Sequence, residues 1–168
     1  VPPAGAAADG SSAVTFHNVG SDFPLYDDLQ EHVIDAGLAA GAGDQVGTVL
    51  YNRGLYAAML AAEAAKTAME IHGTKDLTPA MMRDGMEALE ITEEKMAALG
   101  LPNFGPEFKV SCQNHGGNGM VGMTQWDAEA KEWTLISDFK QSDQDVIQPL
   151  IEQDSTAYAE ENNLEPQC

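Results

Sequence analysis

The sequence predicts an α/β fold, built from helices and strand-like runs that alternate along one chain. Three patterns point to it. A long apolar helical segment occupies residues 47–73, shorter capped helices follow it, and runs rich in β-branched and aromatic residues lie between turn residues on either side. With 168 residues, 43% of them hydrophobic, the chain can bury a real core and is within the size of one domain.

The long helix is expected over residues 52–71. Its opening is polar and aromatic, from Tyr51 to Gly54, and residues 55–62 are then apolar on every side. This pattern predicts that protein encloses the first half of the helix, and that the helix begins at a place where a ligand could bind. Charged residues start at Glu63 and share one helical face, so only the second half should meet water. The apolar stretch is far shorter than the ~20 residues that cross a bilayer.

Four further helices are indicated. An amphipathic stripe over residues 25–34 is closed by Gly37. Gly73 ends the long helix, and Thr78 followed by Pro79 predicts a cap and first turn for a helix over 79–89. Thr92 caps the next helix, which should end at Gly100, and a last helix is expected over 145–162.

Short strands are expected over residues 13–17, 108–111, 119–124 and 133–137. Residues 127–131, between the two tryptophans, are typical of a hairpin connection.

The net charge of −19, from 8 basic and 27 acidic residues, opposes binding to nucleic acid or to anionic lipid surfaces. The acidic residues are dispersed and are interpreted as solvated faces. No phosphate-binding glycine motif opens a helix, and no two of the four histidines are spaced to present a metal-binding pair on one helix. We therefore expect neither a cofactor nor a metal.

The two cysteines, Cys112 and Cys168, form neither a CxxC pair nor a zinc cluster. Either one disulfide or two free thiols remain, and a cysteine at the last residue favours a disulfide formed in an oxidising compartment. The first residues, Val1-Pro2-Pro3, have neither a starting methionine nor a signal-peptide pattern, which predicts a mature or proteolysed chain.

The order of elements resembles a known family. A strand and an acidic helix precede the YNRGLYAAMLAAEAAKTA helix and the TPAMMRDGMEAL helix, and a β segment with QWD and a second tryptophan follows. This resembles the C-terminal part of the type I periplasmic solute-binding proteins of the branched-chain amino acid ABC-transporter family. The resemblance implies a two-lobed fold that closes on an amino acid-like solute and signals to a membrane permease from the periplasm or another extracytoplasmic space.

The resemblance also implies how the chain is divided. Residues 1–107 would contribute mainly to the first lobe, while residues 108–168 would supply the crossover β segment and the C-terminal helix of the second. Helices and strands of this chain would thus belong to both lobes.

The candidate ligand-binding residues are Tyr51, Asn52 and Arg53. Tyr51 matches the position where the family places an aromatic ligand contact, although an aromatic residue there can also simply staple the helix. Asn52 and Arg53 are adjacent donors at the positive end of a helix, which favours a carboxylate. Arg53 could instead form a structural ion pair.

No enzyme activity is expected. Two alternatives remain open: a ligand-sensing regulatory domain of the same fold, and, from another class, a hydrolase that uses His17 or His115 with an acidic neighbour.

Overall fold

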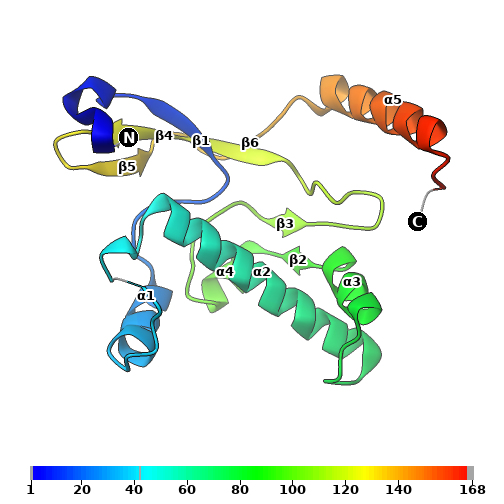
Figure 1. The fold of residues 1–168 in the computed structure, drawn as a ribbon, viewed down its shortest axis with the longest axis horizontal. Helices are drawn as coiled ribbons and strands as arrows, with labels where there is room; N and C mark the ends of the chain where they lie inside the picture. Colours follow the sequence, from blue (N-terminus) through cyan, green and yellow to red (C-terminus); the bar gives the residue numbers. More distant parts are fainter. Residues whose placement is uncertain (1, 42, 166–168) are drawn as a thin grey trace.

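The computed structural model describes residues 2–41 and 43–165, and it confirms the α/β class. Figure 1 shows a sheet at the top, a long helix α2 running below it with smaller helices around it, and a final helix α5 that extends away toward the C-terminus. The chain passes twice between the sheet and the helical layer, once after the first strand and once before the fourth.

The larger sheet is antiparallel and centres on β4 (Met120–Asp127). The first strand, β1 (Ser12–Thr15), pairs with β4, and so do β5 (Glu132–Leu135) and the short β6 (Lys140–Gln141). The predicted hairpin between β4 and β5 is confirmed: the Asp127 carboxylate accepts the N–H groups of Glu129 and Ala130, both at 2.8 Å. The strand β6 was not predicted.

The helix α2 (Val49–His72) ends where its sequence signals place it. At its start the Thr48 hydroxyl accepts a hydrogen bond from the Tyr51 N–H, at 3.4 Å. At its end Gly73, with φ of 64°, donates its N–H to the Met69 carbonyl at 2.8 Å. Glycine adopts this left-handed conformation without steric cost, so the predicted stop at Gly73 is confirmed.

Thr78 caps α3 (Pro79–Glu87) and Thr92 caps α4 (Glu93–Ala98), as predicted. A two-stranded ladder that was not predicted, β2 (Glu90–Ile91) with β3 (Phe108–Lys109), ties the segment between these helices to the return of the chain. The predicted helix over 25–34 consists of α1 (Pro24–Leu29) continued by a π-helical turn, η2 (Gln30–Ile34). Two 3₁₀ segments, η1 (Pro2–Ala8) and η3 (Gly43–Gln45), complete the described elements before α2.

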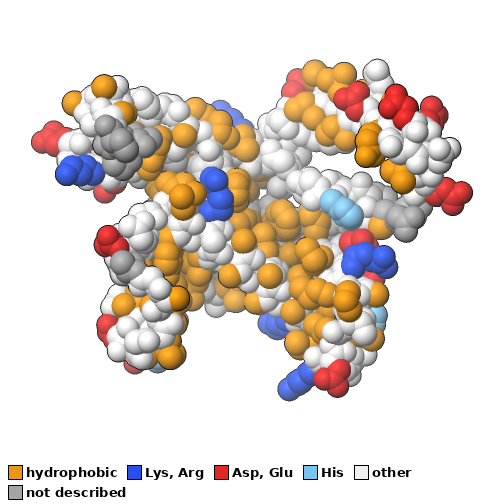
Figure 2. All heavy atoms as spheres, viewed as in Figure 1, with side chains coloured by type: hydrophobic (Ala, Val, Ile, Leu, Met, Phe, Trp, Pro, Cys, Tyr) orange, Lys and Arg blue, Asp and Glu red, His pale blue; other side chains and the backbone are white. Residues whose placement is uncertain are grey.

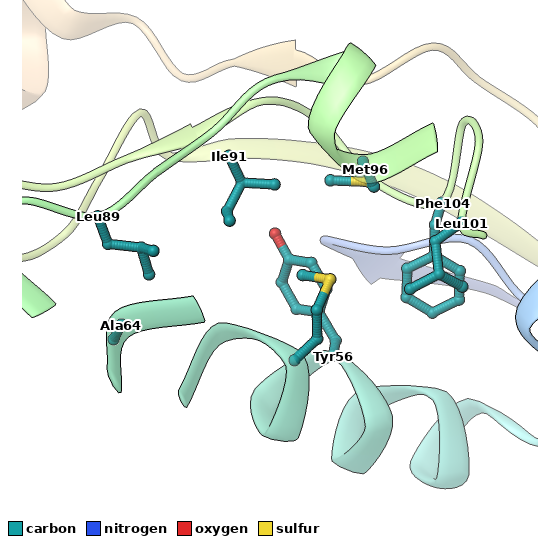
Figure 3. Close-up of a cluster of buried hydrophobic side chains, with 8 residues drawn as sticks. Tyr56, Ala64, Leu89, Ile91, Met96, Leu101 and Phe104 are labelled. Carbon is teal, nitrogen blue, oxygen red and sulfur yellow. The ribbon is translucent and has the colours of Figure 1, made fainter. Parts of the chain in front are cut away.

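Helices α2 and α3 pack on each other and enclose the main hydrophobic core with α4 and β2. Tyr56 and Met59 of α2 face Ile91 and Met96 across this core, and Phe104 closes one end of it, as Figure 3 shows for the labelled residues. Helices α2 and α3 approach closely at Gly85, where an added Cβ would lie 2.3 Å from the Ala64 carbonyl oxygen. Only glycine fits at this position.

Two expectations about α2 need correction. Glu63 does not meet water: it is 6% exposed, and its carboxylate pairs with Lys95 of α4 at 2.7 Å. In the first half, Ala57 and Ala58 are exposed while Tyr56 is buried, so one face of that half is open in the described chain. The buried charge is tolerated because α4 supplies an opposite charge, which the sequence of α2 alone does not reveal.

The last helix, α5 (Gln144–Asn162), buries none of its side chains in the described structure. Among the described residues, no helix is long and apolar enough to cross a membrane. Two pairings cross the predicted boundary at residue 107, because β1 joins β4 and β2 joins β3. The assignment of the two parts to separate lobes stays a prediction.

Candidate functional site

The start of α2 carries all three residues predicted to bind a ligand, and Asn52 is the one that lies inside. Its side chain is fully buried, at 0% exposure. The Tyr26 hydroxyl donates to its amide oxygen at 2.5 Å, and its amide nitrogen donates to the carbonyl of Gly20 at 2.8 Å and to that of Asn18 at 3.3 Å. Asn52 thereby fastens α2 to α1 and to the loop after β1. A ligand could reach this amide only by breaking those bonds.

Tyr51 lies on the solvent-facing side of the contact between α2 and α1. It is half-buried, and its ring centroid lies 6.2 Å from that of Tyr26, with the planes tilted by 39°. Burial raises the pKa of Tyr26 to about 12, with a further contribution from the charge of Tyr51, so Tyr26 stays a hydrogen-bond donor to Asn52. Tyr51 is thus supported by a fixed neighbour while part of its ring stays accessible.

Arg53 is exposed and its guanidinium carbon lies 5.0 Å from the ring centroid of Phe16, at the end of β1. This is a cation–π geometry. Phe16 is itself 40% exposed. The pair places a positive charge beside a partly exposed aromatic side chain, which suits a small molecule with a carboxylate and an apolar group.

Tyr51 and Arg53 point in different directions, because residues two apart on a helix are separated by about 200° around its axis. Tyr51 faces Tyr26 of α1, whereas Arg53 faces Phe16 after β1. The three predicted residues therefore form no single cluster: Asn52 lies between two outward-facing groups on opposite sides of the helix start.

His17, predicted as a possible catalytic residue, is fully buried next to this region. Its ring stacks on Phe104 at 5.7 Å between centroids, and its Nδ1 lies 2.8 Å from the Asn18 carbonyl. That carbonyl requires a proton on Nδ1, so Nε2 is left as an acceptor, and it has no protein partner among the described residues. Burial, assisted by the charge of Arg53, lowers the pKa of His17 below its ordinary value, against the effect of the Asn18 hydrogen bond.

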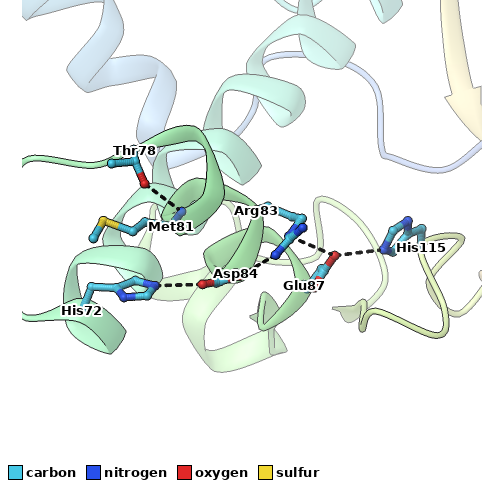
Figure 4. A network of polar contacts seen from close by, with 7 residues as sticks. All are labelled: His72, Thr78, Met81, Arg83, Asp84, Glu87 and His115. Atoms are coloured by element: carbon cyan, nitrogen blue, oxygen red, sulfur yellow. Dashed lines mark hydrogen bonds and ion pairs between the residues drawn. The ribbon is translucent and has the colours of Figure 1, made fainter. Parts of the chain in front are cut away.

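His115 lies at the other end of the helical layer, in a polar network at the end of α3 shown in Figure 4. Its Nε2 is 3.5 Å from the Glu87 carboxylate, which Arg83 also approaches at 3.9 Å. Further along, His72 at the end of α2 contacts Asp84 at 3.0 Å. Arg83, Glu87 and His115 line an apolar cavity of about 440 Å³ between α2, α3 and β3.

The structure also brings Cys112 to this network. One ligand-type atom each from Glu87, Cys112 and His115 lie within 4.8 Å of one another. This cluster was not predicted, because no two histidines are suitably spaced and the two cysteines form no zinc cluster, and Cys112 and His115, three positions apart, were not considered together. The sequence carries no sign that Glu87 would join them. Cys168, the other half of the predicted disulfide, lies outside the described residues.

A second cavity, of about 490 Å³, opens between α4 with its following loop and the sheet. Amide and carboxylate side chains contribute much of its lining, among them Asn18, Asn103, Asn118, Glu107 and Asp138. None of these residues was predicted as a site residue. They belong to loops that converge only when the chain returns from β3 to β4.

No protein-family model matches the chain, and neither does any curated protein. Two solved structures are similar. An ABC transporter permease from the Pseudomonas fluorescens group is 35% identical, with a TM-score of 0.91 over 100% of this chain and 40% of that one. A branched chain amino acid ABC transporter from Thermus thermophilus with bound valine is 19% identical, with a TM-score of 0.60 over 83% of this chain and 35% of that one.

The likeness to the valine-bound protein is a likeness of fold, and that fold is the type I periplasmic-binding fold. The present chain spans well under half the length of either neighbour.

Proposed function

We propose that this chain is part of the extracytoplasmic solute-binding component of an ABC transporter, which binds an amino acid or a similar small amphipathic molecule by closing a cleft. One observation carries the proposal: the chain aligns along its whole length, at 35% identity, with a structure named as an ABC transporter permease, which supports the transporter class. The bound valine of the more distant neighbour supports the class of solute.

At the proposed site, Arg53 pairs with the carboxylate of the solute and Phe16 packs against its apolar part. The guanidinium is exposed and is held over the Phe16 ring at 5.0 Å, so it is placed in advance without being neutralised by that contact. Tyr51 supplies a second aromatic contact on the opposite side of the helix start. Asn52 acts indirectly, by holding the first turn of α2 in place.

A solute that touches both Tyr51 and Arg53 has to be enclosed by protein on more than one side of α2. We propose that the remaining walls come from regions of the component that this chain does not include, since each neighbour has most of its length outside the match. A membrane permease is the proposed partner, and the loaded, closed form is what it would recognise.

We propose that the chain has no enzymatic activity. His17 is oriented by a backbone carbonyl instead of a carboxylate, and its burial keeps it away from substrates. His115 does face a carboxylate, Glu87, at 3.5 Å, but Arg83 also approaches that carboxylate, at 3.9 Å. The regulatory alternative shares the same site, and differs only in what cleft closure is coupled to.

The test is isothermal titration calorimetry of valine, leucine and other amino acids with the protein in its natural full-length form. Tyr51→Ala is expected to weaken binding by roughly 1–3 kcal/mol, about 5- to 150-fold, because a buried aromatic contact is lost. Arg53→Gln should weaken binding of amino acids, but should have a smaller effect on amides that lack the carboxylate.

Tyr158→Ala is the matched control, since Tyr158 is 62% exposed on α5. This variant should bind amino acids with the same affinity as the unaltered protein. The proposal is wrong if the full-length protein binds no amino acid. If Tyr51→Ala and Arg53→Gln both bind with unchanged affinity, the start of α2 is not part of the binding site.

A further inference from the structure

The apolar cavity between α2, α3 and β3 has the size of a small-molecule site. Its volume of about 440 Å³ lies within the roughly 300–1,000 Å³ that such sites occupy. Ala57, Ala61 and Ala64 of α2 line it, and their spacing puts them on one face of the helix. Because alanine side chains are short, this face leaves space that a larger residue would fill. None of the residues of the proposed solute site lines the cavity.

Most of the remaining lining is apolar and belongs to the edge of the main core. Leu89 is 4% exposed, and Leu60, Phe108 and Val110 pack against the core while staying partly exposed. Packing of this kind holds the side chains in place before a ligand arrives, which lowers the entropic cost of binding. Met86 also lines the cavity, and its flexible thioether can fit around apolar groups of different shapes.

Glu87 brings a negative charge to the cavity wall. Its side chain is 20% exposed, whereas Arg83 and His115, which also line the cavity, are 63% and 69% exposed. Both approach the same carboxylate oxygen of Glu87, at 3.9 Å and 3.5 Å, as Figure 4 shows. These separations exceed the ~2.7–2.9 Å of a charge-assisted hydrogen bond. The carboxylate can therefore accept a closer hydrogen bond from a ligand.

The loop that carries His115 is held in a defined turn, so this edge of the cavity keeps its shape. Ser111 and Asn114 form an antiparallel bridge, and their backbone N–H and C=O groups bond reciprocally at 3.1 Å. The Asn114 side chain donates to the Gly117 carbonyl at 2.9 Å.

We propose that this cavity binds a small organic cation with an apolar body, of the class of primary aralkylamines. The ammonium group donates hydrogen bonds to the Glu87 carboxylate, and the apolar body displaces water from the space between Leu60, Phe108 and Val110.

Charge decides between a cation and an anion at this site. An anionic ligand would meet Glu87, which is the least exposed of the three charged or titratable side chains on the wall. The net charge of −19 adds a long-range attraction for cations. The proposed solute site has the opposite preference, because Arg53 there favours a carboxylate. The two proposals therefore stand or fall separately.

The test compares phenethylamine, phenethyl alcohol and hydrocinnamate, which carry a positive, a neutral and a negative end on the same phenylethyl group. They are titrated by calorimetry into the Arg53→Gln variant of the protein in its natural full-length form, so that carboxylate binding at the other site does not mask the cavity. Phenethylamine should bind at least about 10-fold more tightly than the other two, because only its ammonium pairs a positive charge with Glu87.

Methylammonium, which lacks the apolar body, should not compete with phenethylamine. This separates the cavity from general attraction of cations to a chain with a net charge of −19. Equal affinities for phenethylamine and hydrocinnamate would overturn the proposal.

Ala61→Phe should weaken phenethylamine binding by about 10-fold or more, because the added ring occupies the apolar part of the cavity. Ala62→Phe is the matched control: Ala62 is the next residue of α2 and is also exposed, but it does not line the cavity. This control should bind phenethylamine like the parent protein. Unchanged affinity in Ala61→Phe would show that the ligand binds elsewhere, and the proposal would be wrong.

Glu87→Gln keeps the test decisive if Ala61→Phe disturbs folding, because glutamine preserves the size of the side chain and removes its charge. Phenethylamine and phenethyl alcohol should then bind with similar affinity, whereas Glu160→Gln, at an exposed position on α5, should keep the preference for the amine. A Glu87→Gln protein that still prefers the amine would refute the role of Glu87 and the proposal with it. Binding by the 168-residue chain but not by the full-length form would mean that another segment of the protein fills the cavity, which would also overturn the proposal.

Discussion

At the scale of single residues, exposure decides whether a polar side chain near the start of α2 holds the fold together or can meet a ligand. Asn52 has the donors and acceptors of a ligand-binding residue, yet all three of its side-chain hydrogen bonds hold α2 to neighbouring segments. Arg53, the next residue, is exposed and available. Adjacent positions on a helix differ by about 100°, which is enough to place one inside and the next outside.

His17 leads to a prediction about pH. Its folded pKa lies below the ordinary value of 6.5, so below that pH the unfolded chain binds more protons than the folded one. The contribution of neutral His17 to stability is therefore complete above pH 6.5, and is lost as the pH falls from 6.5 down through the folded value. His17→Phe, which keeps an aromatic ring on Phe104, should lose less stability than the unaltered chain over this range.

The measurement is the urea midpoint of the unaltered chain and of His17→Phe at several pH values. The difference between the two midpoints is followed, because the contribution of the acidic residues is the same in both chains and cancels. His32→Gln alters an exposed histidine and should keep the pH dependence of the unaltered chain. Parallel curves for the unaltered chain and His17→Phe would contradict the prediction.

At the scale of elements, the contact between α2 and α3 depends on small side chains. Ala64 and Ala68 of α2 approach Gly85 of α3 so closely that a Cβ at Gly85 would lie 2.3 Å and 2.7 Å from their atoms. Gly54, also within a helix, has open space around it. The same substitution should therefore have opposite effects at the two glycines.

Gly85→Ala should destabilise the chain by about 1–3 kcal/mol, because one helix has to move away from the other. Gly54→Ala should stabilise it by about 0.5–1 kcal/mol, because alanine loses less backbone entropy in a helix. Urea unfolding of the two variants checks both signs. Equal stability of Gly85→Ala and the unaltered chain would mean that α3 does not pack on α2 at this distance.

At the scale of the whole molecule, α5 is the least integrated element. Val146, Leu150 and Ile151 are 57%, 56% and 52% exposed, and the helix buries no side chain in the described structure. Figure 2 shows hydrophobic side chains along its visible surface among acidic ones. Most of the stability of a helix in a protein comes from packing of its apolar face, so the order of α5 depends on what tethers or covers it.

The predicted Cys112–Cys168 disulfide would provide such a tether. The loop it closes holds 57 residues, for which chain entropy suggests about 4 kcal/mol at most. Breaking the bond with Cys168→Ser should raise the amide hydrogen exchange of α5 while that of α2, held by the core, changes little. Alkylation followed by mass spectrometry should find no free thiol in the protein from its native compartment, and two alkylated cysteines there would refute the bond.

The sequence by itself determined the elements whose signals are local. Thr78, Thr92 and Gly73 act on the backbone within a few residues of themselves, and so does the Asp127 turn, which is why these helix ends and the hairpin were predicted correctly. The α/β class was predicted from the helical and strand-like patterns of apolar residues, which are also local. The strand predicted over 108–111 is present as β3, but its partner β2 and the strand β6 were missed, because two-residue strands carry no pattern of their own.

Tertiary structure alone decided which side chains meet. Glu63 is buried because Lys95 arrives from α4, and Phe16 lies under Arg53 because β1 pairs with the distant β4 above the start of α2. Glu87 reaches Cys112 and His115 only when the loop after β3 folds back over α3. Such contacts depend on the packing of whole elements against each other, which no local spacing in the chain encodes.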